Sequence, residues 1–174
     1  LYVGGLYRAK GLEELATALG QLKREGVQFD VDLVGSPAGD VDDVPAWLDR
    51  ALETNDLYDD VTLHGYVDDP HRLAELFSGA DTLVLPSHSE GFPRVVDEAM
   101  SFGLPVVCTA VGGIPARIED GRDARLVPAR NAEALAEALG EVITRPERRR
   151  RLARGAIESF ERRVSETAAE QHIR

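Results

Sequence analysis

Apolar residues recur at two different spacings along the chain, and their succession predicts strands that alternate with helices. Short apolar runs of strand length occupy residues 1–4, 29–35, 61–63, 82–85, 105–108 and 125–127. Apolar side chains at helical spacing predict helices at 12–22, 45–55, 70–77, 93–102, 114–119, 132–144 and 146–163. This alternation is typical of the α/β class. The expected fold is a Rossmann-like, doubly wound parallel sheet of about six strands with helices on both faces.

Local signals refine three of these segments. Asn131 is expected to cap the helix at 132–144, because its side chain can accept a hydrogen bond from the first turn. Residues 40–43 read as an acidic loop. The run Arg148–Arg151 covers every face of a helix and has acidic neighbours, so we interpret it as solvated surface rather than a nucleic-acid site.

The segment 83–113 is the most informative about function, because two glutamates, Glu90 and Glu98, flank a loop-to-helix junction. In a parallel strand–helix–strand unit this loop opens at the carboxyl edge of the sheet, where α/β proteins bind ligands. Pro93 can start the helix, and free backbone N–H groups from Gly91 to Val95 would favour a phosphate. Flanking carboxylates suit hydroxyl groups. A diphosphate with a sugar at each end fits this description.

A simpler interpretation of the same residues stays open. Asp97 and Glu98 can merely complement the helix dipole, with Arg94 and Glu98 forming a weak ion pair one turn apart.

The turn after the first strand is a second candidate for phosphate chemistry. Gly4 and Gly5 end the strand, and Lys10 precedes the first helix. Lys10 can therefore swing over the sheet edge toward a phosphate.

Composition limits the classes of partner and site. The 174 residues fit one domain, and a net charge of −11 argues against nucleic acid or an anionic membrane as the main partner. Cys108 is the only cysteine and lies in an apolar run, which predicts a buried structural thiol and a reducing compartment. No His, Cys or Asp spacing resembles a metal site. No apolar stretch approaches the ~18 residues of a membrane span. The chain begins inside an apparent strand, so a longer protein is expected and the lack of a targeting segment says little.

Six motifs occur in order over nearly the whole chain: YVGGLYRAKG, LHGYV, GADTLVLPS, PSHSEGFPRVVDEAMSFGLPVV, AVGGIP and EDGRDARLVPARNAEALAEAL. This ordered series resembles the donor-binding domain of retaining glycosyltransferases of family 4, which have the two-domain GT-B fold. The resemblance implies that residues 1–163 are the nucleotide-sugar-binding half of such an enzyme. It also implies that an N-terminal acceptor domain lies outside this chain, and that the tail 164–174 frays without it.

The resemblance assigns roles to the residues around the two glutamates. Glu90 would bind hydroxyls of the donor sugar, and Glu98 would bind the ribose hydroxyls. The loop beneath the sugar would be shaped by Gly91, Phe92 and Pro93. Backbone amides at Arg94 and Val95 would meet the diphosphate.

The glycine-rich turn departs from the family pattern. There it usually reads glycine, arginine, four residues, lysine, glycine, and the two cations stabilise the leaving diphosphate. Lys10 matches the lysine, but Gly5 occupies the place of the arginine. Arg8 is a candidate substitute, and an ordinary surface arginine is the alternative. The departure argues for weak or altered activity.

Two further positions correspond to the nucleotide pocket. Residues 64–67, with Gly65 and Tyr66, match the loop that meets the base through backbone groups, so uracil and guanine both stay open. His88 is a candidate to line the pocket, with a surface histidine as the alternative.

The expected function is sugar transfer from a UDP-sugar or GDP-sugar to an acceptor hydroxyl on a lipid, glycan or protein. Glu90 and Lys10 are the expected catalytic residues, with no resident cofactor and no required metal. The chain alone is expected to bind nucleotide without transferring sugar.

The alternatives are a non-catalytic nucleotide-sugar-binding or partner-binding module and, less favoured, an epimerase relative. The expected compartment is the cytoplasm; the inner face of the plasma membrane is open to the full-length enzyme, through segments outside this chain.

Overall fold

The structure, a computed structural model, describes residues 1–37 and 44–171, with side chains as far as residue 166. The acidic loop expected at 40–43 lies outside the described residues.

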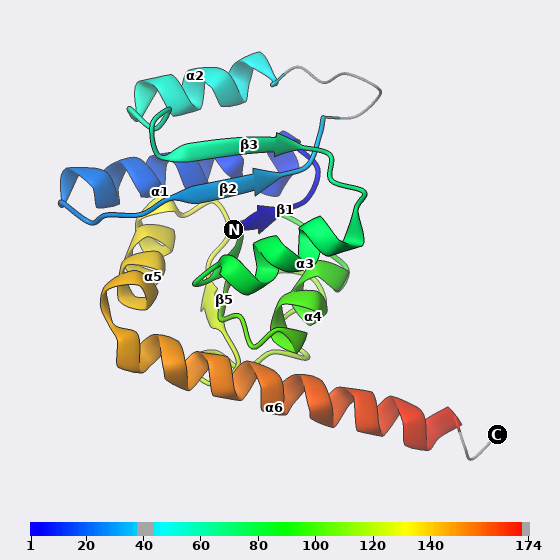
Figure 1. Ribbon diagram of the computed structural model, residues 1–174. Helices are drawn as coiled ribbons and strands as arrows, with labels where there is room; N and C mark the ends of the chain where they lie inside the picture. Colours follow the sequence, from blue (N-terminus) through cyan, green and yellow to red (C-terminus); the bar gives the residue numbers. More distant parts are fainter. Residues whose placement is uncertain (38–43, 172–174) are drawn as a thin grey trace.

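The described part of the chain contains six parallel strands (Figure 1). They are β1 (Tyr2–Val3), β2 (Val31–Val34), β3 (Val61–Gly65), β4 (Leu83–Leu85), β5 (Val106–Thr109) and β6 (Arg125–Val127). The orders β1-β2-β3 and β4-β5-β6 define two three-stranded sheets. They meet where the Val84 N–H donates to the Leu1 carbonyl at 2.9 Å. The resulting order 3-2-1-4-5-6 reverses between β1 and β4, as in doubly wound folds.

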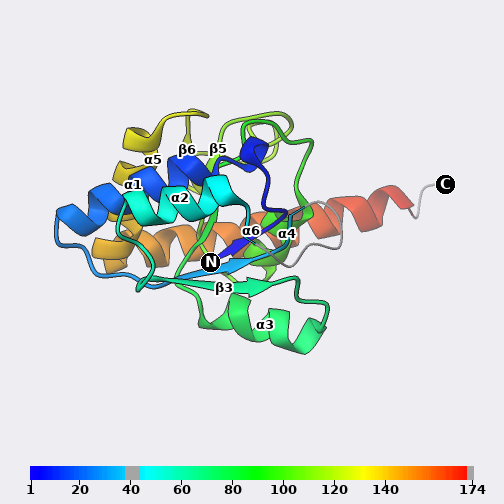
Figure 2. The same cartoon turned by 90° about the horizontal axis from the view of Figure 1, so that it is seen from above.

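Helices cover both faces of the sheet (Figure 2). They are η1 (Arg8–Lys10), α1 (Leu12–Arg24), α2 (Ala46–Thr54), α3 (Pro70–Gly79), α4 (Arg94–Ser101), α5 (Ala132–Thr144) and α6 (Pro146–Gln171). Helices α2 and α5 both pack against α1, α3 lies on the opposite face, and α4 packs against α6. The predicted fold class is therefore confirmed.

The core follows the apolar periodicity. Leu12, Leu15, Leu19 and Leu22 are all buried on α1, and every residue of β4 and β5 is buried. Cys108 in β5 is buried as predicted, and burial raises the pKa of its thiol to about 12. No helix in the described ranges has the length and apolar character needed to cross a membrane.

Element boundaries differ most from the predictions in two places, and most of the others shift by one or two residues. The helix expected at 114–119 is wrong: the segment is a single turn, in which the Ile118 N–H donates to the Ile114 carbonyl at 3.0 Å. It stops there because the Glu119 N–H donates to the Asp123 carboxylate at 3.0 Å. Helix α6 extends to Gln171 rather than residue 163, and Figure 1 shows its end projecting beyond the sheet. The division at residue 163 stays a prediction.

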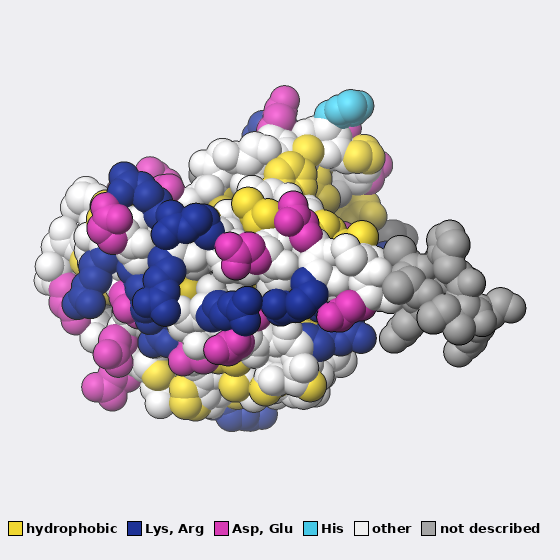
Figure 3. All heavy atoms as spheres, turned by 90° about the horizontal axis from the view of Figure 1, so that it is seen from below, with side chains coloured by type: hydrophobic (Ala, Val, Ile, Leu, Met, Phe, Trp, Pro, Cys, Tyr) yellow, Lys and Arg dark blue, Asp and Glu magenta, His cyan; other side chains and the backbone are white. Residues whose placement is uncertain are grey.

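The arginine run on α6 lies on the face shown in Figure 3, where basic and acidic side chains are interspersed. Arg148 pairs with Glu141 at 2.9 Å, and Arg150 pairs with Glu147 at 2.6 Å. This pattern is that of a solvated, ion-paired helix.

Candidate functional site

The candidate site lies where the strand order reverses, between the carboxyl ends of β1 and β4. Loops that follow adjacent parallel strands open at the same sheet edge, so residues 4–11 and 86–93 meet there. The two segments are far apart in the sequence, and the order of the strands brings them together.

An ion pair joins the two loops. The Lys10 Nζ lies 2.5 Å from the Glu90 Oε1, across 80 residues of sequence. The Ser87 hydroxyl donates to the same oxygen at 2.6 Å. The side chains of Lys10 and Glu90 are only 26% and 11% exposed, so water screens their charges less than at an open surface. The two predicted catalytic residues are therefore in direct contact.

Ser87 is a residue of the candidate site that the sequence reasoning missed. It is completely buried two residues after the end of β4, and its carbonyl accepts a hydrogen bond from the Thr109 hydroxyl on β5 at 2.5 Å. The available signal was a hydroxyl residue near the carboxyl end of each of two apolar runs, Ser87 two residues after β4 and Thr109 as the last residue of β5. Through Ser87, the position of the Glu90 carboxylate is tied to the centre of the sheet.

Close backbone contacts fix the loop that carries Glu90. Gly112 has a φ of +56°, and a Cβ there would lie 1.6 Å from the Glu90 carbonyl oxygen. The next amide, Gly113 N–H, donates to the Gly91 carbonyl at 2.7 Å. The segment after β5 thus packs against the loop after β4 at a distance that only glycine permits.

The loop after β1 is held in a similar way. A Cβ at Gly11, whose φ is +71°, would lie 2.0 Å from the Pro86 carbonyl oxygen, and the His88 N–H donates to the Ala9 carbonyl at 2.8 Å. The His88 ring lies 2.9 Å from the Glu14 carboxylate on α1. His88 is thus part of the loop after β4, with its largely buried ring against α1, and its place in the nucleotide pocket stays a prediction.

The first turn of α4 offers free hydrogen-bond donors. Pro93 is the N-cap rather than the first helical residue, so the helix begins at Arg94, one residue later than predicted. Within the described ranges, no acceptor lies within hydrogen-bonding distance of the backbone N–H groups of Arg94 and Val95. Two free amides at a helix start can bind an anion, and the helix dipole favours negative charge there.

Glu98 lies further along α4 with its side chain exposed to solvent. No ion pair joins Glu98 to Arg94 in the described part of the chain. The Arg94–Glu98 ion pair, which the sequence left open as an alternative to ligand binding, is therefore absent. The Glu98 carboxylate can accept hydrogen bonds from a ligand.

Arg8 does not join the Lys10–Glu90 pair. Its guanidinium pairs with Glu13 at 2.6 Å and lies 5.2 Å from the centre of the Trp47 ring. Gly5 lies in the loop above Tyr2, whose hydroxyl donates to the Gly5 carbonyl at 2.7 Å. Burial, and secondarily the charge of Glu90, raises the pKa of Tyr2, so this phenol remains neutral.

The remaining predicted residues lie around this centre. Gly65 ends β3 with a φ of +66°, and Tyr66 follows it, 76% exposed, at the same sheet edge. The Phe92 ring is half-buried, with the Arg117 guanidinium 4.7 Å from its centre. Among the described residues, no three or more His, Cys, Asp or Glu side chains converge as a metal site would require.

The sequence matches the family model described as Glycosyl transferases group 1 over residues 1–159. Two D-inositol 3-phosphate glycosyltransferases, from Paenarthrobacter aurescens and Saccharomonospora viridis, are 38% and 37% identical over 166 and 131 residues. These alignments cover 92% and 75% of this chain but only 40% and 30% of the relatives. The chain therefore spans well under half of their length.

Solved structures support the same assignment. The sucrose-phosphate synthase of Thermosynechococcus elongatus superposes with a TM-score of 0.80 at 34% identity, over 92% of this chain and 39% of that one. The C-terminal domain of the group 1 glycosyl transferase LpcC from Francisella tularensis gives a TM-score of 0.81 at 22% identity, over 92% of this chain and 82% of that one. Anabaena HepE in complex with UDP-glucose gives 0.81 at 24% identity, over 97% and 48%. The fold is the Rossmann-like half of a GT-B enzyme, and the chain belongs to the glycosyl transferases group 1 family.

Proposed function

We propose that this chain is the donor-binding domain of a retaining glycosyltransferase, which transfers a sugar from a nucleotide diphosphate to an acceptor hydroxyl. The observation that carries the proposal is the meeting of Lys10 and Glu90 at the switch point of the sheet. A cation, a carboxylate and two free helix amides in one place suit a ligand with both phosphate and hydroxyl groups. Family membership and the UDP-glucose complex of HepE support the same ligand class.

The diphosphate would bind at the start of α4. The N–H groups of Arg94 and Val95 would donate to its oxygens, and Lys10 would turn from Glu90 to the phosphate. The two amides and the Lys10 ammonium group would thus stabilise the negative charge of the leaving diphosphate. Because Gly5 replaces the usual arginine and Arg8 pairs with Glu13, Lys10 would be the side-chain cation of this turn that meets the diphosphate.

The two glutamates would then hold the sugars. Glu90, kept in place by Ser87, would accept hydrogen bonds from hydroxyls of the donor sugar. Glu98, exposed on α4, would accept from the ribose. Gly91, Phe92 and Pro93 would shape the loop under the sugar, and the backbone around Gly65 and Tyr66 would contact a uracil or guanine base.

The proposed chemistry is mainly electrostatic stabilisation of the leaving group. Lys10 and the α4 amides would stabilise the departing diphosphate, while Glu90 would orient the sugar for attack from the face that the diphosphate leaves. This arrangement gives retention of configuration and requires no metal. The acceptor would bind to residues outside this chain. The chain spans only 30% and 40% of the length of two relatives, which leaves room for such residues.

Calorimetric titration with UDP, GDP and their sugars tests the proposal. We expect the chain to bind one of these nucleotides, with equal affinity in the presence of EDTA. Lys10→Ala and Glu98→Ala should each weaken binding about tenfold or more, since each removes a charged contact to the ligand. Lys23→Ala is the matched control: Lys23 pairs with Asp60 at 2.8 Å near the other end of α1. Wild-type affinity in Lys10→Ala would contradict the assigned role of Lys10.

Gly5 favours a second candidate, a domain that binds nucleotide sugar without catalysing transfer. The arginine that, with the lysine, stabilises the leaving diphosphate in the family pattern is replaced by Gly5. Under this alternative the chain binds nucleotide sugars, but a protein containing it together with its acceptor domain transfers none. Failure of this chain to bind any nucleotide at millimolar concentration would instead favour a partner-binding module.

A further inference from the structure

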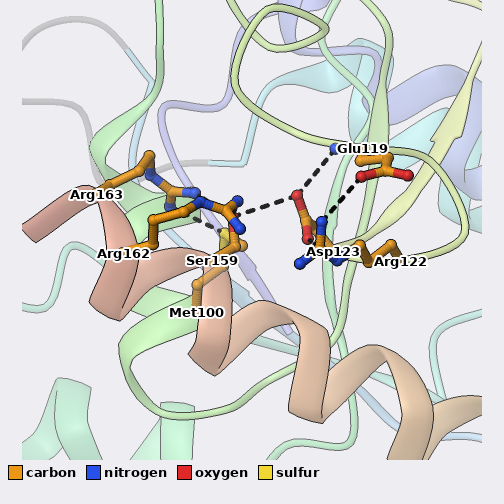
Figure 4. Close-up of polar contacts among 7 residues, drawn as sticks. All are labelled: Met100, Glu119, Arg122, Asp123, Ser159, Arg162 and Arg163. Atoms are coloured by element: carbon orange, nitrogen blue, oxygen red, sulfur yellow. Dashed lines mark hydrogen bonds and ion pairs between the residues drawn. The ribbon is translucent and has the colours of Figure 1, made fainter. Parts of the chain in front are cut away.

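A buried polar network connects the last helix to the segment that follows β5 (Figure 4). At its centre is Ser159 on α6, which is completely buried. Its hydroxyl donates to the Asp123 carboxylate at 3.2 Å and accepts from Arg162 at 3.1 Å and Arg163 at 2.7 Å. A hydroxyl has one donor and two acceptor positions, so all are used.

Asp123 and Gly155 anchor this part of α6. Asp123 is buried, accepts from the Glu119 N–H at 3.0 Å, and has the Arg122 Nε 3.9 Å from its other oxygen. A Cβ at Gly155 would lie 2.0 Å from the Arg122 carbonyl oxygen, so α6 lies directly against this segment. The helix position, and with it the position of Arg163, is therefore closely defined.

From this anchored position Arg163 reaches the proposed donor site. Its Nη2 lies 2.6 Å from the Asp97 Oδ1 in the first turn of α4 and 3.3 Å from the Met100 Sδ. Its guanidinium carbon lies 5.9 Å from the centre of the Phe92 ring. The Arg163 and Asp97 side chains are 17% and 37% exposed, so the pair is partly shielded from solvent.

Asp97 poses an electrostatic problem for a diphosphate at the start of α4. It lies three residues after Arg94, which is about 4.5 Å along the helix axis from one of the two free amides. An uncompensated carboxylate in the first turn of α4 would repel a ligand with two or more negative charges bound at these amides. The ion pair with Arg163 compensates it.

We infer that Arg163 is a positioning residue for nucleotide diphosphates, which cancels the charge of Asp97 beside the phosphate site and supports Phe92 in the adjoining loop. The inference rests on the proposed function, because it concerns the same donor site. It extends that site to α6, whose residues are remote in sequence from both glutamates. Arg163 itself need not touch the ligand.

The affinity of the chain for UDP, or for GDP if the chain selects guanine, tests the inference by calorimetry. Arg163→Ala should bind the nucleotide about tenfold more weakly, since one uncompensated charge then faces the diphosphate. Adding Asp97→Asn to Arg163→Ala should restore most of the affinity, because the repelling carboxylate is removed. Arg163→Lys should bind nearly as well as wild type. A purely structural role for Arg163 would not give rescue by Asp97→Asn.

Arg162→Ala is the matched control, because Arg162 is the adjacent arginine and donates to the same Ser159 hydroxyl. It should leave the nucleotide affinity unchanged, and thermal unfolding should show every variant to be folded. If wild type binds nucleotide and Arg163→Ala binds equally well, only this inference fails. If Asp97→Asn gives no rescue, the electrostatic role is wrong. If the unsubstituted chain binds neither UDP nor GDP, the proposed function fails, and the inference fails with it.

Discussion

Glu90 is the residue on which most of the candidate site converges. Lys10 and Ser87 both contact its Oε1, and Gly112 packs against its carbonyl oxygen. The side chain is thus fixed by polar partners and the backbone by steric contact. The steric contact comes from Gly112, which has no side chain that could take part in binding or catalysis.

Gly112→Ala should disrupt this arrangement. The new Cβ would lie 1.6 Å from the Glu90 carbonyl oxygen, and the φ of +56° disfavours a side chain by about 1–2 kcal/mol before the clash is counted. We expect a lower free energy of unfolding and weaker UDP binding. Gly91→Ala is the stability control, because a Cβ there has nothing within 4 Å. Equal melting temperature and UDP affinity in Gly112→Ala and wild type would refute the prediction.

Among the elements, α5 shows how a local signal and packing act together. It begins after Asn131, whose side-chain oxygen accepts from the Ala134 N–H at 2.9 Å, as the sequence predicts. The buried residues of α5 pack against α1 and against β5, one of the strands of the sheet that carries the site. The cap removes one of the unsatisfied amides of the first turn.

Asn131→Ala should lower the free energy of unfolding by about 1 kcal/mol, because that amide loses its partner at the surface. Asn131→Asp should keep the stability, since aspartate accepts the same hydrogen bond and suits the helix dipole. Urea unfolding followed by circular dichroism measures both. A loss of equal size in the two variants would show that the cap is not what Asn131 contributes.

At the scale of the whole molecule, the proposed function makes the chain one half of a binding site. The loops after β1 and β4 carry groups suited to the donor, and the chain spans 30% and 40% of the length of two relatives. In the proposed enzyme, transfer needs the donor and the acceptor hydroxyl to be held together in a reactive geometry.

The 174 residues alone should therefore bind nucleotide and transfer no sugar. Incubation with a nucleotide sugar and candidate acceptors, followed by mass spectrometry of the products, measures transfer directly. Lys10→Ala identifies any background reaction that does not use the site. Robust transfer by the wild-type chain, lost in Lys10→Ala, would show that no further domain is needed.

The fold was largely predictable from the sequence, whereas the site was predictable only as separate residues. Strand β6 and helix α5 have the predicted bounds, because their signals are local. The segment 114–119 was mispredicted as a helix because the Asp123 carboxylate takes the Glu119 amide, a contact that a periodicity pattern does not contain. Ser87 was missed for a similar reason: its importance comes from burial beneath Glu90.

By itself the sequence determined the succession of strands and helices, the buried Cys108 and the candidate residues Lys10, Glu90 and Glu98. These follow from side-chain period, capping and turn residues, which act over a few positions. Only the tertiary structure decided that Lys10 meets Glu90 and that Arg163 meets Asp97, contacts that span 80 and 66 residues. Such contacts depend on strand order and on the packing of α6 against α4, which are set by burial of the whole core and not by any local pattern.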